Sequence, residues 1–174
     1  MTRGIDWILM TLFAFAAFIA LYYEPAFFYQ CGWEGLKAGA GGACEASWVG
    51  RAWLGYLQVE PLYANAPLFL RLINEFDTWL FGWFYALSLI VFLRGRQERP
   101  WYRFLGTFVC GMMIYAMALY LGWESLSYRE TGAHLQAVFT YNGLWLCLFL
   151  LLLARLHLFG SGAKSPAIGV PAKT

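Results

Sequence analysis

Two carboxyl groups stand in apolar surroundings along this chain of 174 residues. Glu24 ends the run Leu21-Tyr22-Tyr23 in one apolar stretch, and Asp77 lies inside another. An ionisable side chain at membrane depth is costly and usually faces a cavity, so the pair predicts a buried acid/base site. The alternative is that both lie at the water interface, as ordinary charges at the level of the lipid headgroups.

Further polar side chains share the helical face of Asp77. This face consists of Asn74, Asp77, Thr78 and Phe81, which follow the i, i+3, i+4, i+7 spacing of a helix. The spacing predicts a stripe that carries an amide, a carboxyl and a hydroxyl on a membrane helix. Thr78 is therefore a candidate ligand-binding residue beside the catalytic candidate Asp77.

A second polar face lies near the end of the chain, where Asn142 and Trp145 are three residues apart. A buried amide requires hydrogen-bond partners, and the π face of an indole attracts a cation, so both residues are ligand-binding candidates. Two alternatives stay open: Asn142 holds a neighbouring helix through a hydrogen bond, and Trp145 anchors its helix at the interface.

Tyr115 and Glu124 are two further ligand-binding candidates. Glu124 ends the third apolar stretch, where it either closes the mouth of the pocket or lies in water. Tyr115 lies deeper in that stretch, in a position to support a carboxylate. Spacing alone assigns a role to neither.

The composition requires a membrane to hold these residues. The chain is 61% hydrophobic and 13% charged, against about half and a quarter in soluble domains. Four apolar stretches reach the length of about 20 residues that a span needs: 7–29, 67–93, 101–123 and 135–157. We expect an all-α, four-transmembrane-helix bundle with an intramembrane pocket in one domain, residues 1–160, and a disordered cytoplasmic tail, residues 161–174. Nothing in the charge pattern favours nucleic-acid binding.

Basic residues predict the orientation of the bundle. Arginines crowd the short turn after the second stretch, and such clusters favour the cytoplasmic side. With this turn and both termini inside, the inner cations are Arg3, Arg94, Arg96, Arg99, Arg103, Arg155, Lys164 and Lys173. The outer cations are Lys37, Arg51, Arg71 and Arg129. The chain does not reveal whether the membrane is bacterial or that of the endoplasmic reticulum.

The cysteines and histidines restrict the chemistry. Cys31 and Cys44 bracket a Gly-rich stretch on the outer, oxidising side, which allows a disulfide between them. No Cys-x-x-Cys pair is present for thiol oxidation, and the two histidines, His134 and His157, lie near the ends of the last span. Haem ligation is therefore disfavoured, and we predict neither a metal nor a cofactor.

At these residues the chain resembles the emopamil-binding protein family, which includes sterol delta-8,delta-7 isomerase and the sigma-2 receptor. The resemblance covers all four spans. Its motifs are Phe13-Ala14 with Phe18-Ile19 and Glu24; Phe76-Asp77-Thr78 followed by Phe92-Leu93-Arg94; Ile114-Tyr115 with Glu124; and Asn142-Gly143-Leu144-Trp145-Leu146. It implies that Glu24 and Asp77 are the two pocket acids, Asn142 the pocket amide and Trp145 the tryptophan that faces the ligand. It also makes a homodimer an expectation.

The chain departs from the family at two positions that affect the reaction. Ala20 stands where the sterol isomerases have a histidine, one helical turn before the first acid. Asp77 replaces a glutamate of the family and shortens the reach by one methylene. Glu60, in Glu60-Pro61-Leu62, is similar to an acidic-Pro-Leu segment of the sigma-2 branch and is interpreted as structural.

The resemblance and the paired carboxyls together favour an intramembrane isomerase that moves a carbon–carbon double bond in a sterol or other polycyclic terpenoid. Two acids in one apolar cavity can divide the roles, because burial and mutual repulsion keep one of them protonated while the other acts as base. The residues do not decide which carboxyl is the acid. The alternatives are a non-catalytic sterol or lipid binding protein, and a structural bundle in which the polar stripe joins helices.

Overall fold

The computed structural model describes residues 2–39, 41–128 and 135–159. All the regular elements in these ranges are helices, and four of the helices are long and apolar enough to cross a membrane. The predicted tail, residues 161–174, lies outside the described residues, as do Arg129 and His134. The protein is thus an all-α, four-helix multi-pass membrane protein.

Two of the four spans are interrupted helices. The first consists of α1 (Thr2–Phe18), the π turn η1 (Ile19–Tyr23) and α2 (Glu24–Gln30), and the second of α5 (Leu68–Phe76), the π turn η4 (Asp77–Phe81) and α6 (Gly82–Leu93). The third is α7 (Pro100–Ser127), which runs four residues past the predicted end, and the fourth is α8 (Leu135–His157). Pro100 ends the turn after α6 and occupies the first position of α7, where its missing N–H is tolerated.

The two π turns lie side by side at the level of the two predicted acids. Glu24 directly follows η1, and Asp77 begins η4. A π turn changes which way the following side chains point, and such turns are frequent at functional sites. The turns approach closely because Gly82 has no side chain: a Cβ there would lie 2.8 Å from a methyl group of Leu21 and 3.2 Å from the Cβ of Ala20.

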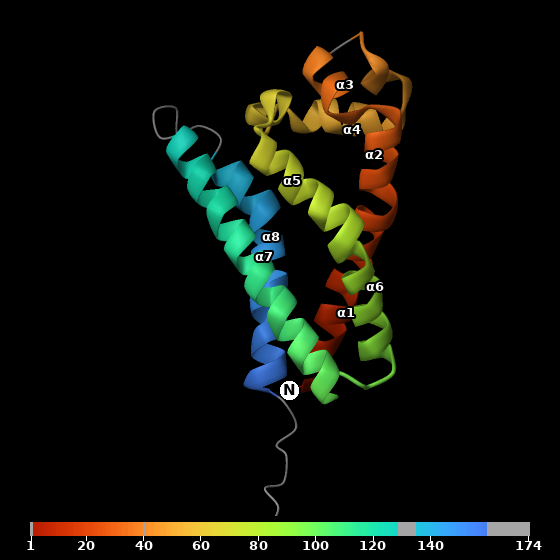
Figure 1. Ribbon diagram of the computed structural model, residues 1–174, viewed down its shortest axis with the longest axis vertical. Coiled ribbons are helices and arrows are strands. Elements are labelled where there is room, and N and C mark those ends of the chain that lie inside the picture. Colours follow the sequence, from red (N-terminus) through yellow and green to blue (C-terminus); the bar gives the residue numbers. More distant parts are fainter. Residues whose placement is uncertain (1, 40, 129–134, 160–174) are drawn as a thin grey trace, which may run out of the picture.

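The spans pack as two pairs, α1 with α6 and α7 with α8, and the pairs are joined along α1 and α8 (Figure 1). One apolar core fills the half of the bundle that holds the N-terminus. Large apolar side chains cover the outer surface, including Trp79, Trp83, Phe104 and Phe108. This surface suits lipid, because a soluble protein rarely exposes so much contiguous apolar area.

The segment between the first two spans forms a helical cap, residues 31–67, at the end of the bundle opposite the N-terminus (Figure 1). It contains α3 (Gly32–Ala38), η2 (Ala43–Ala46), α4 (Trp48–Tyr56) and η3 (Pro61–Asn65). α4 runs across the bundle rather than along it. A second apolar core joins the cap to α2 and to the far half of α7.

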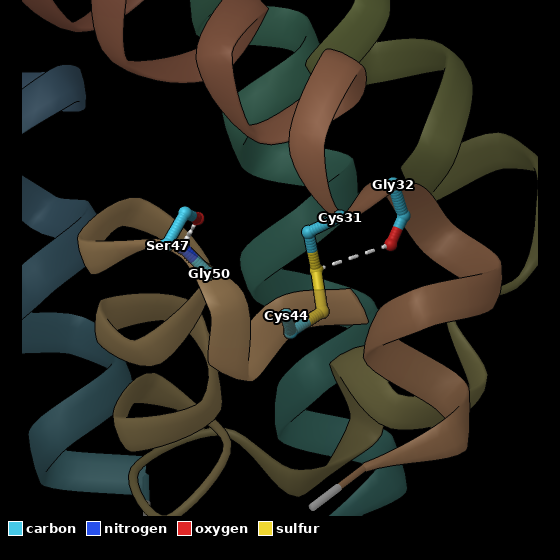
Figure 2. Close-up of a disulfide and its surroundings, with 5 residues drawn as sticks. All are labelled: Cys31, Gly32, Cys44, Ser47 and Gly50. Carbon is cyan, nitrogen blue, oxygen red and sulfur yellow. Dashed lines mark hydrogen bonds between the residues drawn. A yellow bond between two sulfur atoms is a disulfide. The ribbon is translucent and has the colours of Figure 1, made fainter. Parts of the chain in front are cut away.

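A disulfide holds the start of the cap together. Cys31 and Cys44, the pair predicted from the sequence, are bonded with their Cα atoms 4.5 Å apart, which lies within the normal range (Figure 2). Nearby, the hydroxyl of Ser47 accepts a hydrogen bond of 3.0 Å from the backbone N–H of Gly50 and so caps the N-terminus of α4. The disulfide thus joins the end of α2 to η2, and Ser47 stabilises the start of the helix that follows.

Gly50 is the position where the cap tolerates no side chain. A Cβ at Gly50 would lie 2.1 Å from the carbonyl oxygen of Cys44, whereas a Cβ at Gly55, in the same helix, would meet nothing within 4 Å. We therefore expect Gly50→Ala to destabilise the protein by about 1–3 kcal/mol, a typical cost of overpacking. Gly55→Ala, the matched control, should be neutral or slightly stabilising because alanine favours helix.

The measurement is the midpoint of thermal unfolding in detergent for the two variants beside the wild type. A clear fall for Gly50→Ala alone is the expected result. Equal midpoints for Gly50→Ala and the wild type would show that α4 does not pack on η2 as described.

Candidate active site in the bundle

Glu24 is buried at the start of α2 and faces the second span. Thr78, in η4, donates a hydrogen bond through its hydroxyl to Glu24 Oε2, and the same hydroxyl lies 2.9 Å from the backbone carbonyl oxygen of Asn74. A hydroxyl has one hydrogen, so both contacts are hydrogen bonds at the same time only when the Glu24 carboxyl carries a proton. The Thr78 hydroxyl can therefore donate to Glu24 when the carboxyl is ionised and accept from it when the carboxyl is protonated.

Asp77 is buried one residue before Thr78 and has a different partner. Tyr85, two turns further along the second span, donates its hydroxyl hydrogen to Asp77 Oδ1. The two acids thus differ in their hydrogen bonding, although both are buried in the same part of the bundle.

Trp145 lies beside the Asp77–Tyr85 pair. Its ring stacks on Tyr85 with the centroids 6.1 Å apart, and on Phe15 of α1 with the centroids 6.4 Å apart. The indole is thereby held between the first, second and fourth spans. The Trp145 side chain packs on neighbouring spans inside the bundle and lines the two cavities described next.

A small inner cavity of about 60 Å³ brings the predicted residues together. Its walls come from the second, third and fourth spans, from Glu24 and from the cap. The polar and aromatic lining residues are Glu24, Tyr63, Asn74, Asp77, Tyr120, Asn142 and Trp145. The tertiary structure thus places both predicted acids, the predicted amide and the predicted tryptophan around one space.

A larger cavity of about 540 Å³ adjoins it and shares Glu24, Asn142 and Trp145 as lining residues. This volume lies in the range of cavities that hold small molecules. α4 forms its roof, while Phe15 of α1 and Leu144 of α8, both exposed on the outer surface, form part of its rim. The cavity therefore opens sideways between the first and fourth spans, toward the surrounding lipid.

A second pair of buried carboxyl groups, Glu60 and Glu124, lies at the cap end. Glu60 is fully buried and accepts hydrogen bonds from the hydroxyls of Tyr56 and Tyr120, one at each carboxyl oxygen. Glu124 is also fully buried and lies against Glu60, but its oxygens accept no hydrogen bond from any described residue. Two ionised carboxylates have no hydrogen to donate, so a hydrogen bond between Glu60 and Glu124 requires a proton on one of them.

Asn142 connects this cap-end pair to the cavities. Its side-chain nitrogen lies 3.1 Å from each of three acceptors, which share its two hydrogens: the hydroxyl oxygens of Tyr56 and Tyr120 and the backbone carbonyl oxygen of Val138. Glu60 Oε2 lies 3.4 Å from the same nitrogen. Asn142 is thus more than a contact between two helices, because it lies between a buried acid and a cavity.

The tyrosines of the cap remain neutral. Burial raises the pKa of Tyr56 above its usual value, and the neighbouring Tyr63 and Glu60 raise it further. Burial and the charge of Glu60 raise the pKa of Tyr63 in the same direction. Both hydroxyls therefore keep their hydrogens throughout the physiological pH range. Tyr56 donates its hydrogen to Glu60, and the Tyr63 oxygen accepts a hydrogen bond from the side-chain amide of Asn74.

The structure places two of the predicted ligand-binding residues elsewhere. Tyr115 is exposed and lines a separate apolar groove between η4 and α7, so it supports neither acid. Glu124 neither closes the pocket mouth nor lies in water, because it is buried against Glu60 and does not line the cavities. Rotation of α7 about its axis decides whether these two side chains face the cavities or another surface. The spacing of residues along one helix does not determine that rotation.

Sequence reasoning missed the four tyrosines of the site, Tyr56, Tyr63, Tyr85 and Tyr120, and the burial of Glu60. The chain contains 11 tyrosines, so the residue type by itself singled out none of them. A signal did exist for Glu60: an acid directly before a proline, between apolar residues, is poorly placed for a solvated loop. Among the described residues, no three His, Cys, Asp or Glu side chains gather as metal ligands.

Comparison of the chain with protein-family models, with curated proteins and with solved structures finds no match in any of the three.

Proposed function

We propose that the protein is an intramembrane isomerase that shifts a carbon–carbon double bond in a sterol or another polycyclic terpenoid. The observation that carries the proposal is that two buried carboxyls, Glu24 and Asp77, line the inner cavity together with Trp145. Glu24 and Trp145 also line the larger cavity that opens toward lipid. A hydrophobic substrate reaches such a site from the membrane, without crossing water. The resemblance to the emopamil-binding protein family supports the same reaction class.

The hydrogen bonds suggest how the two acids divide the work. Glu24, whose contact with Thr78 accommodates a proton, acts as the acid and adds its hydrogen to one alkene carbon. The other alkene carbon becomes a cation, which the π face of Trp145 stabilises. Asp77, which Tyr85 positions through a hydrogen bond to Oδ1, is the base. It removes a proton from the adjacent carbon, and the electrons of that C–H bond form the new double bond.

The step is balanced because one proton enters the substrate and one leaves it. After product release Asp77 carries a proton and Glu24 lacks one, so a proton must return to Glu24 before the next turnover. The inner cavity borders both carboxyls and is large enough to hold water, which can carry the proton between them.

A specific observation favours a second candidate function, a binding protein that holds the same class of ligand without reaction. Ala20 is fully buried and lies against Gly82, so no side chain at this position handles a proton beside Glu24. The contact leaves no room for the histidine that the sterol isomerases have there. Without that partner for proton transfer, the same cavity would bind the ligand and leave it unchanged.

The experiment is incubation of the detergent-purified protein with a delta-8 sterol in heavy water, followed by mass spectrometry of the recovered lipid. The Glu24→Gln, Asp77→Asn double variant serves as control. Deuterium in a product with a shifted double bond, absent with the double variant, is the expected result. Saturable sterol binding without deuterium uptake would favour the binding protein, and the absence of both would exclude this ligand class.

The charge distribution supports an orientation with the N-terminus and the α6–α7 turn in the cytoplasm. Among the described residues, that end of the bundle carries Arg3, Arg94, Arg96, Arg99, Arg103 and Arg155, and the cap end carries Lys37, Arg51 and Arg71. The cap and its disulfide then face the oxidising side, where such bonds persist. Labelling of single cysteines introduced at the two ends, with a reagent that does not cross membranes, tests the assignment.

A further inference from the structure

The orientation of the Asn142 amide follows from its neighbours. The hydroxyls of Tyr56 and Tyr120 both donate their hydrogens to Glu60, so toward Asn142 their oxygens only accept. The backbone carbonyl of Val138 is also an acceptor. A side-chain amide surrounded by acceptors must turn its N–H group toward them, because its carbonyl oxygen would meet no hydrogen there.

The carbonyl oxygen of the Asn142 side chain is the part of the amide that these acceptors do not contact. It has no hydrogen-bond donor among the residues that the structure describes, and Asn142 lines both the inner and the larger cavity. An amide oxygen at an apolar cavity gains from a donor on the ligand and loses when an apolar or acceptor group displaces water from it. The site therefore distinguishes donors from acceptors.

We propose that Glu60 is a positioning residue that fixes the Asn142 amide with its carbonyl oxygen toward the cavity. The ligand that this arrangement selects is an apolar polycyclic molecule bearing a hydrogen-bond donor, an alcohol or a protonated amine. The inference deepens the proposed function and rests on it, since it assumes that the cavity binds such a ligand. Glu60 itself lines neither cavity and acts only through Tyr56, Tyr120 and Asn142.

Replacing the Glu60 carboxylate with a neutral amide should remove the constraint on the orientation of the Asn142 side chain. In Glu60→Gln, the new NH2 group has two hydrogens, and it donates one to Glu124 and one to a tyrosine oxygen. That tyrosine can then turn its own hydrogen toward Asn142. The Asn142 amide becomes free to present either its oxygen or its N–H group to the cavity. Discrimination between donor and acceptor ligands should fall, while the shape of the cavity stays nearly unchanged because the two side chains are isosteric.

The test compares the affinities for two probes, a delta-8 sterol with a free 3-hydroxyl and the corresponding 3-ketone, which accepts but does not donate. For the wild type we expect tighter binding of the alcohol by about tenfold, the value of one hydrogen bond at a buried acceptor. Glu60→Gln should reduce this ratio to about two or less. Glu34→Gln, at an exposed position outside the network, is the matched control and should keep the wild-type ratio.

A second variant keeps the test decisive if Glu60→Gln does not fold. Asn142→Leu removes the accepting oxygen without altering Glu60, and it should abolish the preference through loss of alcohol binding. A merely structural role of Glu60 would weaken both probes equally and leave the ratio unchanged, which would overturn the inference.

The remaining outcomes separate the inference from the proposed function. If the wild type binds both probes with equal affinity, the inference is wrong and the proposed function stands. If it binds neither probe, the ligand class is wrong and the inference fails with it.

Discussion

Replacing Asp77 with asparagine should lower the rate of double-bond isomerisation by about 10²–10⁴-fold, the usual contribution of a positioned general base. Asparagine has the shape of aspartate and can still accept the hydrogen bond from Tyr85. It cannot take a proton from the substrate. Affinity for the sterol should change by only a few fold, because the reaction step and not the binding step needs the carboxylate.

Glu75→Gln is the matched control, because it changes an acid two residues away in the same span. The Glu75 carboxylate accepts a hydrogen bond of 3.2 Å from Trp33 in the cap and lines none of the cavities described above. Turnover and affinity, measured together for both variants by deuterium uptake and by equilibrium binding, separate the roles. A turnover for Asp77→Asn within threefold of the wild type would remove Asp77 from the mechanism.

Arg155→Met should cause a large loss of stability, about 3–5 kcal/mol, because it removes two hydrogen bonds between charged groups, each worth about 1.5–3 kcal/mol. Arg155 lies near the end of α8 and is only 2% exposed. Its guanidinium contacts Asp6 of the first span at 2.5 Å and Glu98 of the α6–α7 turn at 2.7 Å. One cation thus joins three segments at the end of the bundle that holds the N-terminus.

The free energy of unfolding in mild detergent, compared for the wild type and three variants, checks this expectation. Arg96→Met, at an exposed arginine in the same turn, should stay close to the wild type because surface charges contribute little. Adding Asp6→Asn and Glu98→Gln to Arg155→Met should recover part of the loss, since the two negative charges that Arg155 no longer balances are then absent. If Arg155→Met and Arg96→Met unfold alike, the buried network contributes no stability.

The four spans were readable from the sequence because a membrane imposes a length and a polarity on each segment independently of its neighbours. Apolar runs predicted helices at the places where α1–α2, α5–α6, α7 and α8 occur. The exceptional polar side chains in those runs also marked the site, since a buried carboxyl or amide needs a partner. Glu24, Asp77, Asn142 and Trp145 accordingly line one inner cavity.

The partners of these residues depended on contacts between segments far apart in the chain. Glu24 meets Thr78 only because two π turns pack together, and helical periodicity contains no sign of such a turn. For the same reason the sequence did not show that Tyr115 is exposed. The rotation of α7 depends on its packing against α8, which helical periodicity does not contain.

The sequence by itself therefore determined the membrane class, the four helices and the polar residues that line the inner cavity, all of which follow from local composition. Only the tertiary structure decided that Glu60, separated from Tyr120 by 60 positions, belongs to the hydrogen-bond network that orients Asn142. The physical reason is the distance along the chain over which each interaction acts. The free energy of a span depends on its own side chains and the surrounding lipid, whereas a hydrogen bond depends on two groups brought within about 3 Å of each other.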